Sequence, residues 1–216
     1  MLSPRARPAV AFGNVARAQL QHPGGLASER EEPDQRLGGG PDKCPQSAVL
    51  VPVPEAEAIV GDWRAVHDPR ARTGVPAHIT LIVPWVPPEQ LKQEHLEELD
   101  ELLADQEPFD YVLDRVCWFG ERVLWLAPTP AEPFKQLTMA LAARFDTPPW
   151  QGEFSEVVPH LTVGLAGYGE AHTLAEAAED LSAKLPLRCR ARKVDVMSGD
   201  GTHWKVVHRV VLRSQR

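Results

Sequence analysis

The chain has 216 residues, of which 43% are hydrophobic and 25% charged, and its formal net charge is -7. Such a chain can bury one good core or two small lobes, and its acidic balance excludes a broad nucleic-acid surface, which needs clustered cations. Its apolar runs fall far short of the roughly 20 residues of a membrane helix, and its N-terminus has no compact signal-peptide core. The sequence therefore predicts a soluble, cytoplasmic protein without a membrane segment.

The first part of the chain carries no periodic signal. Residues 1–46 are rich in Pro, Gly, Arg and Ala and show no sustained helical or strand pattern. This composition is typical of disordered or loosely attached segments. We expect a dispensable N-terminal extension at 1–46 and a single folded domain at 47–216.

The folded region begins with alternating strand and helix signals. One helix is expected to carry Ile59, Trp63 and Val66 on one face and to end at Pro69. The next helix places Leu91, His95, Leu99 and Leu102 on one side, which makes His95 a helix residue without a catalytic partner. The elements expected here are a strand at 47–54, a helix at 55–69, a polar loop at 70–76, a strand from His78 and a helix within 89–106.

The second half adds a hairpin to this alternation. Two strand-like runs flank the short sequence Phe119, Gly120 and Glu121, a hairpin signal. The elements expected here are strands at 109–118 and 122–128, a helix at 132–145, a strand from His160, a helix at 173–185, and strands at 186–198 and 202–212. Alternating strands and helices with hairpins among them indicate an α+β protein of two similar lobes.

Two of the strand-like runs carry the same polar pair. PAHITLIVPW, from Pro76, places His78 and Thr80 two residues apart, and VPHLTVGLAG, from Val158, repeats this with His160 and Thr162. Strand side chains alternate between faces, so each His shares a face with its Thr, opposite the apolar residues. A lone strand His is usually a hydrogen-bonded core residue, but two copies arise by chance at only about the 0.002 level. The repetition indicates a function.

Two imidazoles suit the opening of a cyclic phosphodiester. That reaction needs a base to deprotonate water and an acid, on the opposite side of phosphorus, to protonate the departing alkoxide. An imidazole has a pKa near 6.5, so one His can be neutral and the other charged near neutral pH. Thr80 and Thr162 can donate hydroxyl hydrogen bonds to the non-bridging phosphoryl oxygens. The scheme requires no metal and no cofactor, and it leaves open which His is the base.

The two motifs resemble the paired His-x-Thr motifs of the 2H phosphoesterase superfamily, and more closely those of the bacterial 2'-5' RNA ligase (LigT-like) family. The resemblance extends over residues 47 to about 165 and assigns the family's motif positions to His78, Thr80, His160 and Thr162. It implies a bilobed α+β fold in which two antiparallel sheets form a V-shaped groove, with helices on the outside and the four motif residues at its floor. Trp85 stands where related proteins often have Phe, and residues 1–46 have no family counterpart.

The resemblance also implies an activity. We expect a metal-independent RNA 2',3'-cyclic phosphodiesterase that yields a 2'-phosphate, with weak 2'-5' RNA ligation as the reverse reaction. Its partner would be an RNA 3' end or a small cyclic-phosphate nucleotide, and the oligomeric state stays open. Trp85 and Trp204 are candidates to stack on a base or ribose, with core packing as the alternative. Arg72 is a candidate phosphate contact, with a solvated loop charge as the alternative.

Two other functions stay open. A non-catalytic module could hold a nucleotide or RNA end in the same groove, although binding alone would not require a second proton-transfer group. A metal hydrolase could use His160 with His172 or His203 and nearby carboxylates, but the short-spaced His and Glu patterns of zinc helices are missing. His203 and His208 fall on opposite strand faces, which disfavours joint catalysis.

Overall fold

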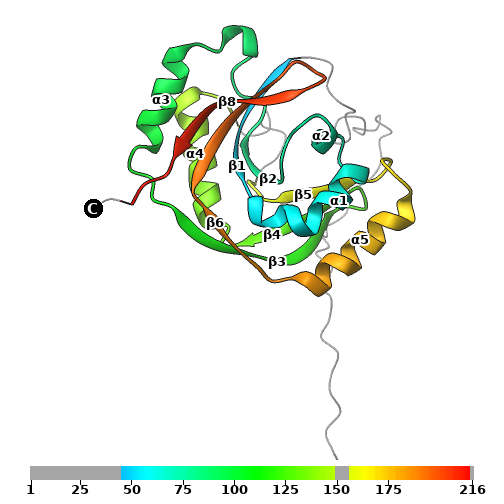
Figure 1. Ribbon diagram of the computed structural model, residues 1–216. Helices are drawn as coiled ribbons and strands as arrows, with labels where there is room; N and C mark the ends of the chain where they lie inside the picture. The colour runs from blue at the N-terminus through cyan, green and yellow to red at the C-terminus, as the bar shows by residue number, and fades with distance from the viewer. Residues whose placement is uncertain (1–44, 149–155, 215–216) are drawn as a thin grey trace, which may run out of the picture. The chain divides into compact units, whose positions relative to one another are not determined.

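The computed structural model describes residues 45–148 and 156–214. Within these ranges, eight strands form two antiparallel sheets of four (Figure 1). Sheet A has the order β2-β1-β7-β8, and sheet B has the order β5-β4-β3-β6. The strands of sheet A are β1 (Gln46–Pro52), β2 (His78–Ile82), β7 (Lys193–Gly199) and β8 (Trp204–Val211). Those of sheet B are β3 (Phe109–Phe119), β4 (Val123–Thr129), β5 (Leu161–Leu165) and β6 (Leu187–Ala191).

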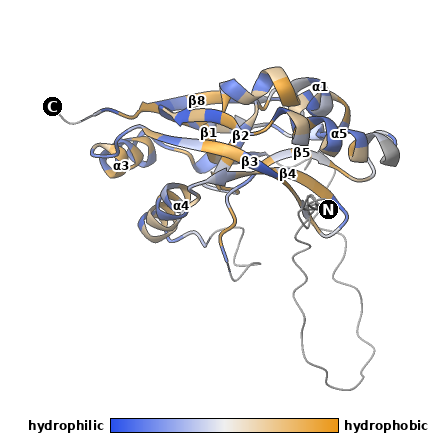
Figure 2. Cartoon of the chain, turned by 90° about the horizontal axis from the view of Figure 1, so that it is seen from below, coloured by the Kyte–Doolittle hydropathy of each residue, from blue (hydrophilic) through white to orange (hydrophobic). Residues whose placement is uncertain are grey.

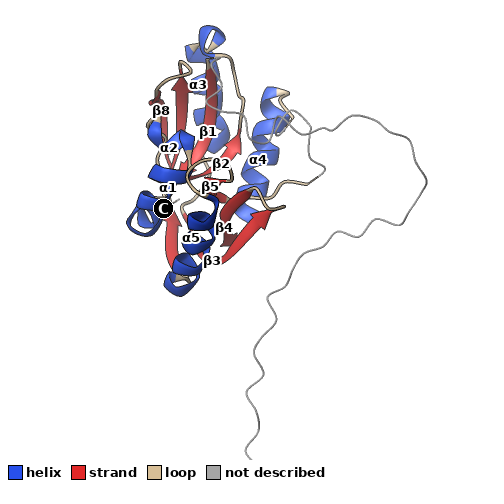
Figure 3. Cartoon of the chain, turned by 90° about the vertical axis from the view of Figure 1, so that its right-hand side faces the viewer, coloured by secondary structure: helices blue, strands red, loops and turns tan. Residues whose placement is uncertain are grey.

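Five α-helices of the described region accompany the sheets: α1 (Glu57–His67), α2 (Pro69–Arg72), α3 (Gln93–Leu103), α4 (Glu132–Phe145) and α5 (Ala171–Lys184). Short 3-10 turns precede α1 at Pro54–Ala56 and α3 at Pro88–Gln90. The two halves of the chain exchange helices. Helix α1 follows a strand of sheet A but packs against β5 of sheet B, whereas α4 follows a strand of sheet B but packs against β2 of sheet A. The interleaving can be followed in Figure 3.

One hydrophobic core joins the two sheets. Ile79 and Leu81 of β2 are fully buried in it, together with Leu124 and Leu126 of β4. His78 and Thr80 alternate with these apolar residues along β2 and stay partly exposed on the other face. Each fully buried Ile or Leu contributes roughly 1.5–3 kcal/mol, so the apolar face sets the direction in which the polar face points. Figure 2 shows hydrophobic segments in both the strands and the helices.

The predicted fold class is confirmed: the domain is α+β, with two antiparallel sheets and helices packed on them. The predicted hairpin is present as β3 and β4, and α4 has the predicted bounds of 132–145. None of the helices in the described ranges is long and apolar enough to cross a membrane. Except for residues 45 and 46, the predicted N-terminal extension lies outside the described residues.

The predicted face of the first helix is confirmed for Ile59 and Trp63, which pack against the core, and is wrong for Val66. Helix α1 buries Val60, Arg64 and His67, whereas Val66, placed on the core face by its spacing, is 45% exposed. Hydropathy assigns Arg64 and His67 to solvent because both are polar. They are buried because partners distant in sequence satisfy them, among them the carbonyls of Val75 for Arg64 and Tyr168 for His67.

Three other boundaries differ from the prediction. The run at 186–198 is two strands, since β6 pairs with β3 in sheet B and β7 pairs with β1 in sheet A. The polar loop begins as helix α2, because the Asp68 carboxylate accepts a hydrogen bond from the backbone N–H of Arg70 and caps the helix. Helix α3 begins only at Gln93, after Leu91, and buries Leu99 and Leu103.

Candidate active site

The edge strands of the two sheets bring the repeated motifs together. β2 is the edge of sheet A, β5 is the edge of sheet B, and the two strands contact each other. A cavity of about 530 Å³ lies between the sheets at this point. Its lining includes His78, Thr80, His160 and Thr162. The four residues predicted from the two motifs therefore share one cavity.

Each motif histidine is held by a carbonyl two residues before it. Nδ1 of His78 lies 2.7 Å from the carbonyl oxygen of Pro76, and Nδ1 of His160 lies 2.7 Å from that of Val158. A carbonyl oxygen can only accept a hydrogen bond, so Nδ1 carries the proton in both rings and donates it. Nε2 is then the unprotonated nitrogen of each neutral ring, and both rings line the cavity.

The cavity disfavours a positive charge on either ring. The pKa of His78 is lowered to about 3, mainly by burial. The positive charges of Arg64, of His160 when it is charged, and of Arg70 act in the same direction, whereas the hydrogen bond to the Pro76 carbonyl opposes them. Burial also lowers the pKa of His160, against the opposing effect of its hydrogen bond to Val158. Both rings are therefore neutral at pH 7 in the protein alone. An anionic phosphate placed between them would raise the pKa of each and allow one to hold a proton.

Aromatic side chains of the β3–β4 hairpin surround His160. The rings of Phe119 and Trp125 lie edge-on to the imidazole, with centroid distances of 5.0 and 5.8 Å. Phe119 also stacks on Trp125 at 4.7 Å and lines the cavity. The sequence pattern places Phe119 only in the turn. In the structure β3 and β4 continue pairing as far as Phe119 and Val123, so Phe119 belongs to a strand and lines the cavity.

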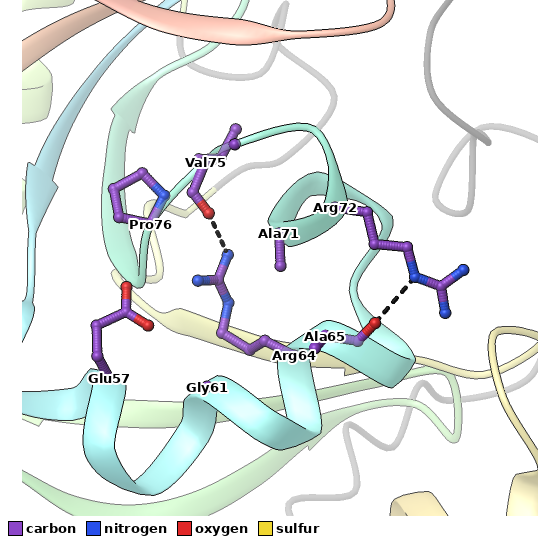
Figure 4. Close-up of a pocket in the computed structure, with 9 residues that line it drawn as sticks. Glu57, Gly61, Arg64, Ala65, Ala71, Arg72, Val75 and Pro76 are labelled. Carbon is purple, nitrogen blue, oxygen red and sulfur yellow. Dashed lines mark hydrogen bonds between the residues drawn. The ribbon is translucent and has the colours of Figure 1, made fainter.

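Two arginines line the cavity, and neither was predicted. They are Arg70, from α2, and Arg122, from the hairpin. The predicted phosphate contact, Arg72, points elsewhere: its guanidinium donates to the carbonyls of Ala65 and Val66 at 2.9 and 2.6 Å (Figure 4). Residues two apart on a helix face nearly opposite sides, so once 69–72 is helical, Arg70 and Arg72 cannot both reach the cavity. The two-residue spacing of Arg70 and Arg72 would have predicted their different directions only if residues 69–72 had been recognised as a helix.

The two predicted tryptophans have different positions. Trp204 lines the cavity, and the Arg70 guanidinium lies 5.7 Å from the centre of its ring. Its backbone N–H donates to the carbonyl of Thr73, which attaches the start of β8 to the loop after α2. Trp85 is only 5% exposed, packs edge-on against Phe145 and does not line the cavity. Trp85 therefore occupies a core position, the alternative considered for it.

The histidines of the metal alternative do not assemble a ligand set in the described region. Among the residues described there, no group of three or more His, Cys, Asp or Glu lies close enough to hold a metal ion. His203 is exposed and hydrogen-bonds to Thr202, and His208 pairs with Asp100 at 2.8 Å. The side chain of His172 lies outside what the structure describes.

Comparison with known proteins agrees with the motifs. The family model described as 2'-5' RNA ligase superfamily matches residues 52–203. Similar solved structures include E. coli LigT complexed with 3'-AMP, with 22% identity, a TM-score of 0.49, and coverage of 79% of this chain and 99% of that one. A structure described as a phosphoesterase has 23% identity, a TM-score of 0.48, and coverage of 78% and 99%. Usb1 of Kluyveromyces marxianus has 11% identity, a TM-score of 0.36, and coverage of 77% and 98%. No curated protein matches the sequence significantly.

Proposed function

The chain belongs to the 2'-5' RNA ligase superfamily, and on this premise we propose that it is a metal-independent RNA 2',3'-cyclic phosphodiesterase. Its product would be a 2'-phosphate. With the 5'-hydroxyl of a second RNA as the nucleophile in place of water, the same opening of the cyclic phosphate, with the 3'-oxygen as leaving group, would give 2'-5' RNA ligation. Membership by itself indicates phosphodiester chemistry. The more specific activity is supported by one observation above all, the convergence of His78 and His160 on one cavity.

The two rings suit proton transfer on opposite sides of a phosphorus atom. His78 begins β2 and His160 directly precedes β5, the edge strands of different sheets, so the two rings can approach a substrate in the cavity from two sides. One Nε2 would take a proton from the attacking water while the other ring, protonated, would donate to the departing 3'-oxygen. The anionic phosphate supplies the field that lets the second ring hold its proton, although burial lowers its pKa in the protein alone.

The threonines and arginines suit stabilisation of the charged phosphate. Thr80 and Thr162 line the cavity beside the rings, and their hydroxyls can donate to the non-bridging oxygens as negative charge develops on them. Arg70 and Arg122 add positive charge to the same cavity, which offsets the acidity of the chain as a whole. The indole of Trp204 and the ring of Phe119 offer aromatic faces to a base or ribose.

Phosphate-product analysis tests the activity. A 2',3'-cyclic-phosphate mononucleotide and a short RNA ending in a cyclic phosphate are incubated with the full chain in the presence of a chelator. We expect turnover to a 2'-phosphate, and a loss of at least about 10²-fold in His78→Ala and in His160→Ala, because each general acid or base contributes that much or more. His203→Ala is the matched control, since His203 is exposed and does not line the cavity.

The remaining outcomes separate the alternatives. If the chain binds the nucleotide but does not turn it over, the proposed activity is wrong, and the chain is instead a module that holds a nucleotide or RNA end in the same groove. Turnover that disappears in chelator and returns with one metal ion would contradict the metal-independent scheme.

A further inference from the structure

A buried guanidinium lies directly behind the segment that carries His78. Arg64 of α1 is 2% exposed, and its Nε and Nη2 donate to one carboxylate oxygen of Asp68 at 3.1 and 2.8 Å. Nη2 also donates to the carbonyl of Val75 at 3.1 Å. A buried charge at such a position is costly unless it is paired and hydrogen-bonded, and these contacts meet that condition. Arg64 thereby attaches α1 to the residue before Pro76.

A second side chain of α1 holds the residue after Pro76. Oε1 of Glu57 accepts a hydrogen bond from the backbone N–H of Ala77 at 2.6 Å. Glu57 and Arg64 are seven residues apart, so they lie two turns apart on the same face of the helix. Figure 4 shows both side chains reaching from α1 toward Val75 and Pro76.

Pro76 itself carries the contact that orients the catalytic candidate. Its carbonyl accepts the hydrogen bond from Nδ1 of His78, and this bond selects the ring nitrogen that faces the cavity. The groups that α1 binds, the Val75 carbonyl and the Ala77 N–H, lie on the two sides of this residue. The Ala77 carbonyl is held in turn by the N–H of Val53, at the end of β1. The segment cannot rotate without breaking one of these bonds.

We propose that Glu57 and Arg64 are positioning residues for the reaction, which hold the Pro76 carbonyl where it fixes the orientation and tautomer of His78. The inference rests on the proposed function and adds to it two side chains that lie outside the reaction cavity. Neither was a candidate from the sequence, because the core face predicted for this helix consisted of Ile59, Trp63 and Val66.

Arg64 also has an electrostatic effect on His78. Its charge lowers the pKa of that imidazole, in the same direction as burial. The other charged or titratable groups around the ring are Asp68, Arg70, Arg122, Glu156 and His160, which line the same cavity. Arg64 itself does not line that cavity, and its guanidinium is paired with the Asp68 carboxylate. Loss of this charge should raise the pKa of His78.

The first arm of the test is kinetic and uses the full chain. In Glu57→Leu the Ala77 N–H loses its acceptor, and we expect kcat to fall about tenfold or more with KM little changed, because misplacement by about 1 Å can cost 10²-fold. Glu57→Gln keeps an acceptor oxygen and should recover most of this loss. Arg64→Lys keeps the charge but not the fork of donors, so kcat should fall as well. Arg72→Met is the control, because the guanidinium of Arg72 donates to the carbonyls of Ala65 and Val66 in α1 and makes no contact with the segment before His78 among the hydrogen bonds of the described residues.

The second arm reads His78 without relying on turnover. Nitrogen chemical shifts of labelled histidines, followed against pH, report the tautomer and the pKa. We expect His78 to be protonated at Nδ1 in the wild type, to lose this preference in Glu57→Leu and Arg64→Met, and to gain about one pKa unit or more in Arg64→Met but not in Arg64→Lys. An unchanged tautomer and pKa in both folded variants would overturn the inference. A wild type without turnover would contradict the proposed function alone, since the shifts would still report the positioning.

Discussion

The two motif histidines have the same hydrogen-bond geometry in different surroundings. Each donates from Nδ1 to the carbonyl two residues before it. His78, however, is subject to the positive charges of Arg64 and Arg70, whereas Phe119 and Trp125 pack edge-on against His160. The repeated sequence therefore presents two chemically different imidazoles to one cavity. An acid and a base need such a difference, since they must be in different protonation states when the reaction begins.

Arg70 and Arg72 offer a matched pair of substitutions that tests substrate binding. Arg70 lines the cavity, whereas Arg72 donates to the carbonyls of Ala65 and Val66. We expect Arg70→Ala to raise KM for a cyclic-phosphate nucleotide about tenfold, the effect of losing a hydrogen bond to a charged group. Arg72→Ala should leave KM within about twofold of the wild type. Equal effects of the two substitutions in steady-state kinetics would argue against a phosphate contact by Arg70.

The close approach of helix α1 to strand β5 depends on a glycine, Gly164, which has no side chain. A Cβ at Gly164 of β5 would lie 2.5 Å from Cβ of His67 and 2.7 Å from Cδ1 of Leu174. Glycine at this position lets a helix that follows β1 of sheet A pack on a strand of sheet B. The exchange of helices between the two sheets therefore depends partly on one small residue in the second motif strand.

Substitution of this glycine should destabilise the domain. We expect Gly164→Ala to lower the free energy of unfolding by about 1–3 kcal/mol, the usual result of overpacking a core, as measured by urea denaturation. Gly61→Ala is the control within α1, because its nearest neighbour would be a Glu57 carboxylate oxygen at 3.7 Å, an ordinary contact. That variant should be neutral or slightly more stable, since alanine favours helix. A tolerated Gly164→Ala would show that α1 can move away from β5.

Burial of the two motif imidazoles makes the stability of the domain depend on pH. A ring with its pKa lowered to about 3 stays neutral in the folded chain, while in the unfolded chain the same ring takes up a proton below about 6.5. The unfolded state then binds more protons, so stability falls as pH falls through this range and is fully present only above about 6.5. The lowered pKa of His160 acts in the same direction.

This dependence can be measured by comparing variants. Between pH 6.5 and 5 the His78 contribution should decrease by about 2 kcal/mol, at 1.36 kcal/mol per pKa unit. Urea denaturation of the wild type and of His78→Asn at pH 7 and pH 5 isolates this contribution from that of the carboxylates. The wild type should lose more stability than the variant. An equal loss in both proteins would mean that His78 becomes protonated in the folded state well above pH 5.

The elements that could be read from the sequence are those with local signals. The apolar alternation of β2 and the amphipathic pattern at 132–145 predicted a strand and a helix that the structure contains. The run at 186–198 was predicted as one strand because no glycine or proline separates β6 from β7, whereas its pairing partner changes from sheet B to sheet A. Pairing is a contact between distant residues, and local periodicity does not encode it.

The same distinction between local signals and contacts of distant residues applies to the candidate site. Residue order along the chain was enough to identify the repeated His and Thr pairs, their common strand face and the family, since none of these depends on contacts between distant residues. Only the tertiary structure placed Arg70 rather than Arg72 at the cavity, buried Trp85, and brought Glu57 and Arg64 behind His78. Those positions depend on where a helix begins and on which segments pack against it. Hydrogen bonds and burial between residues far apart in the chain decide both.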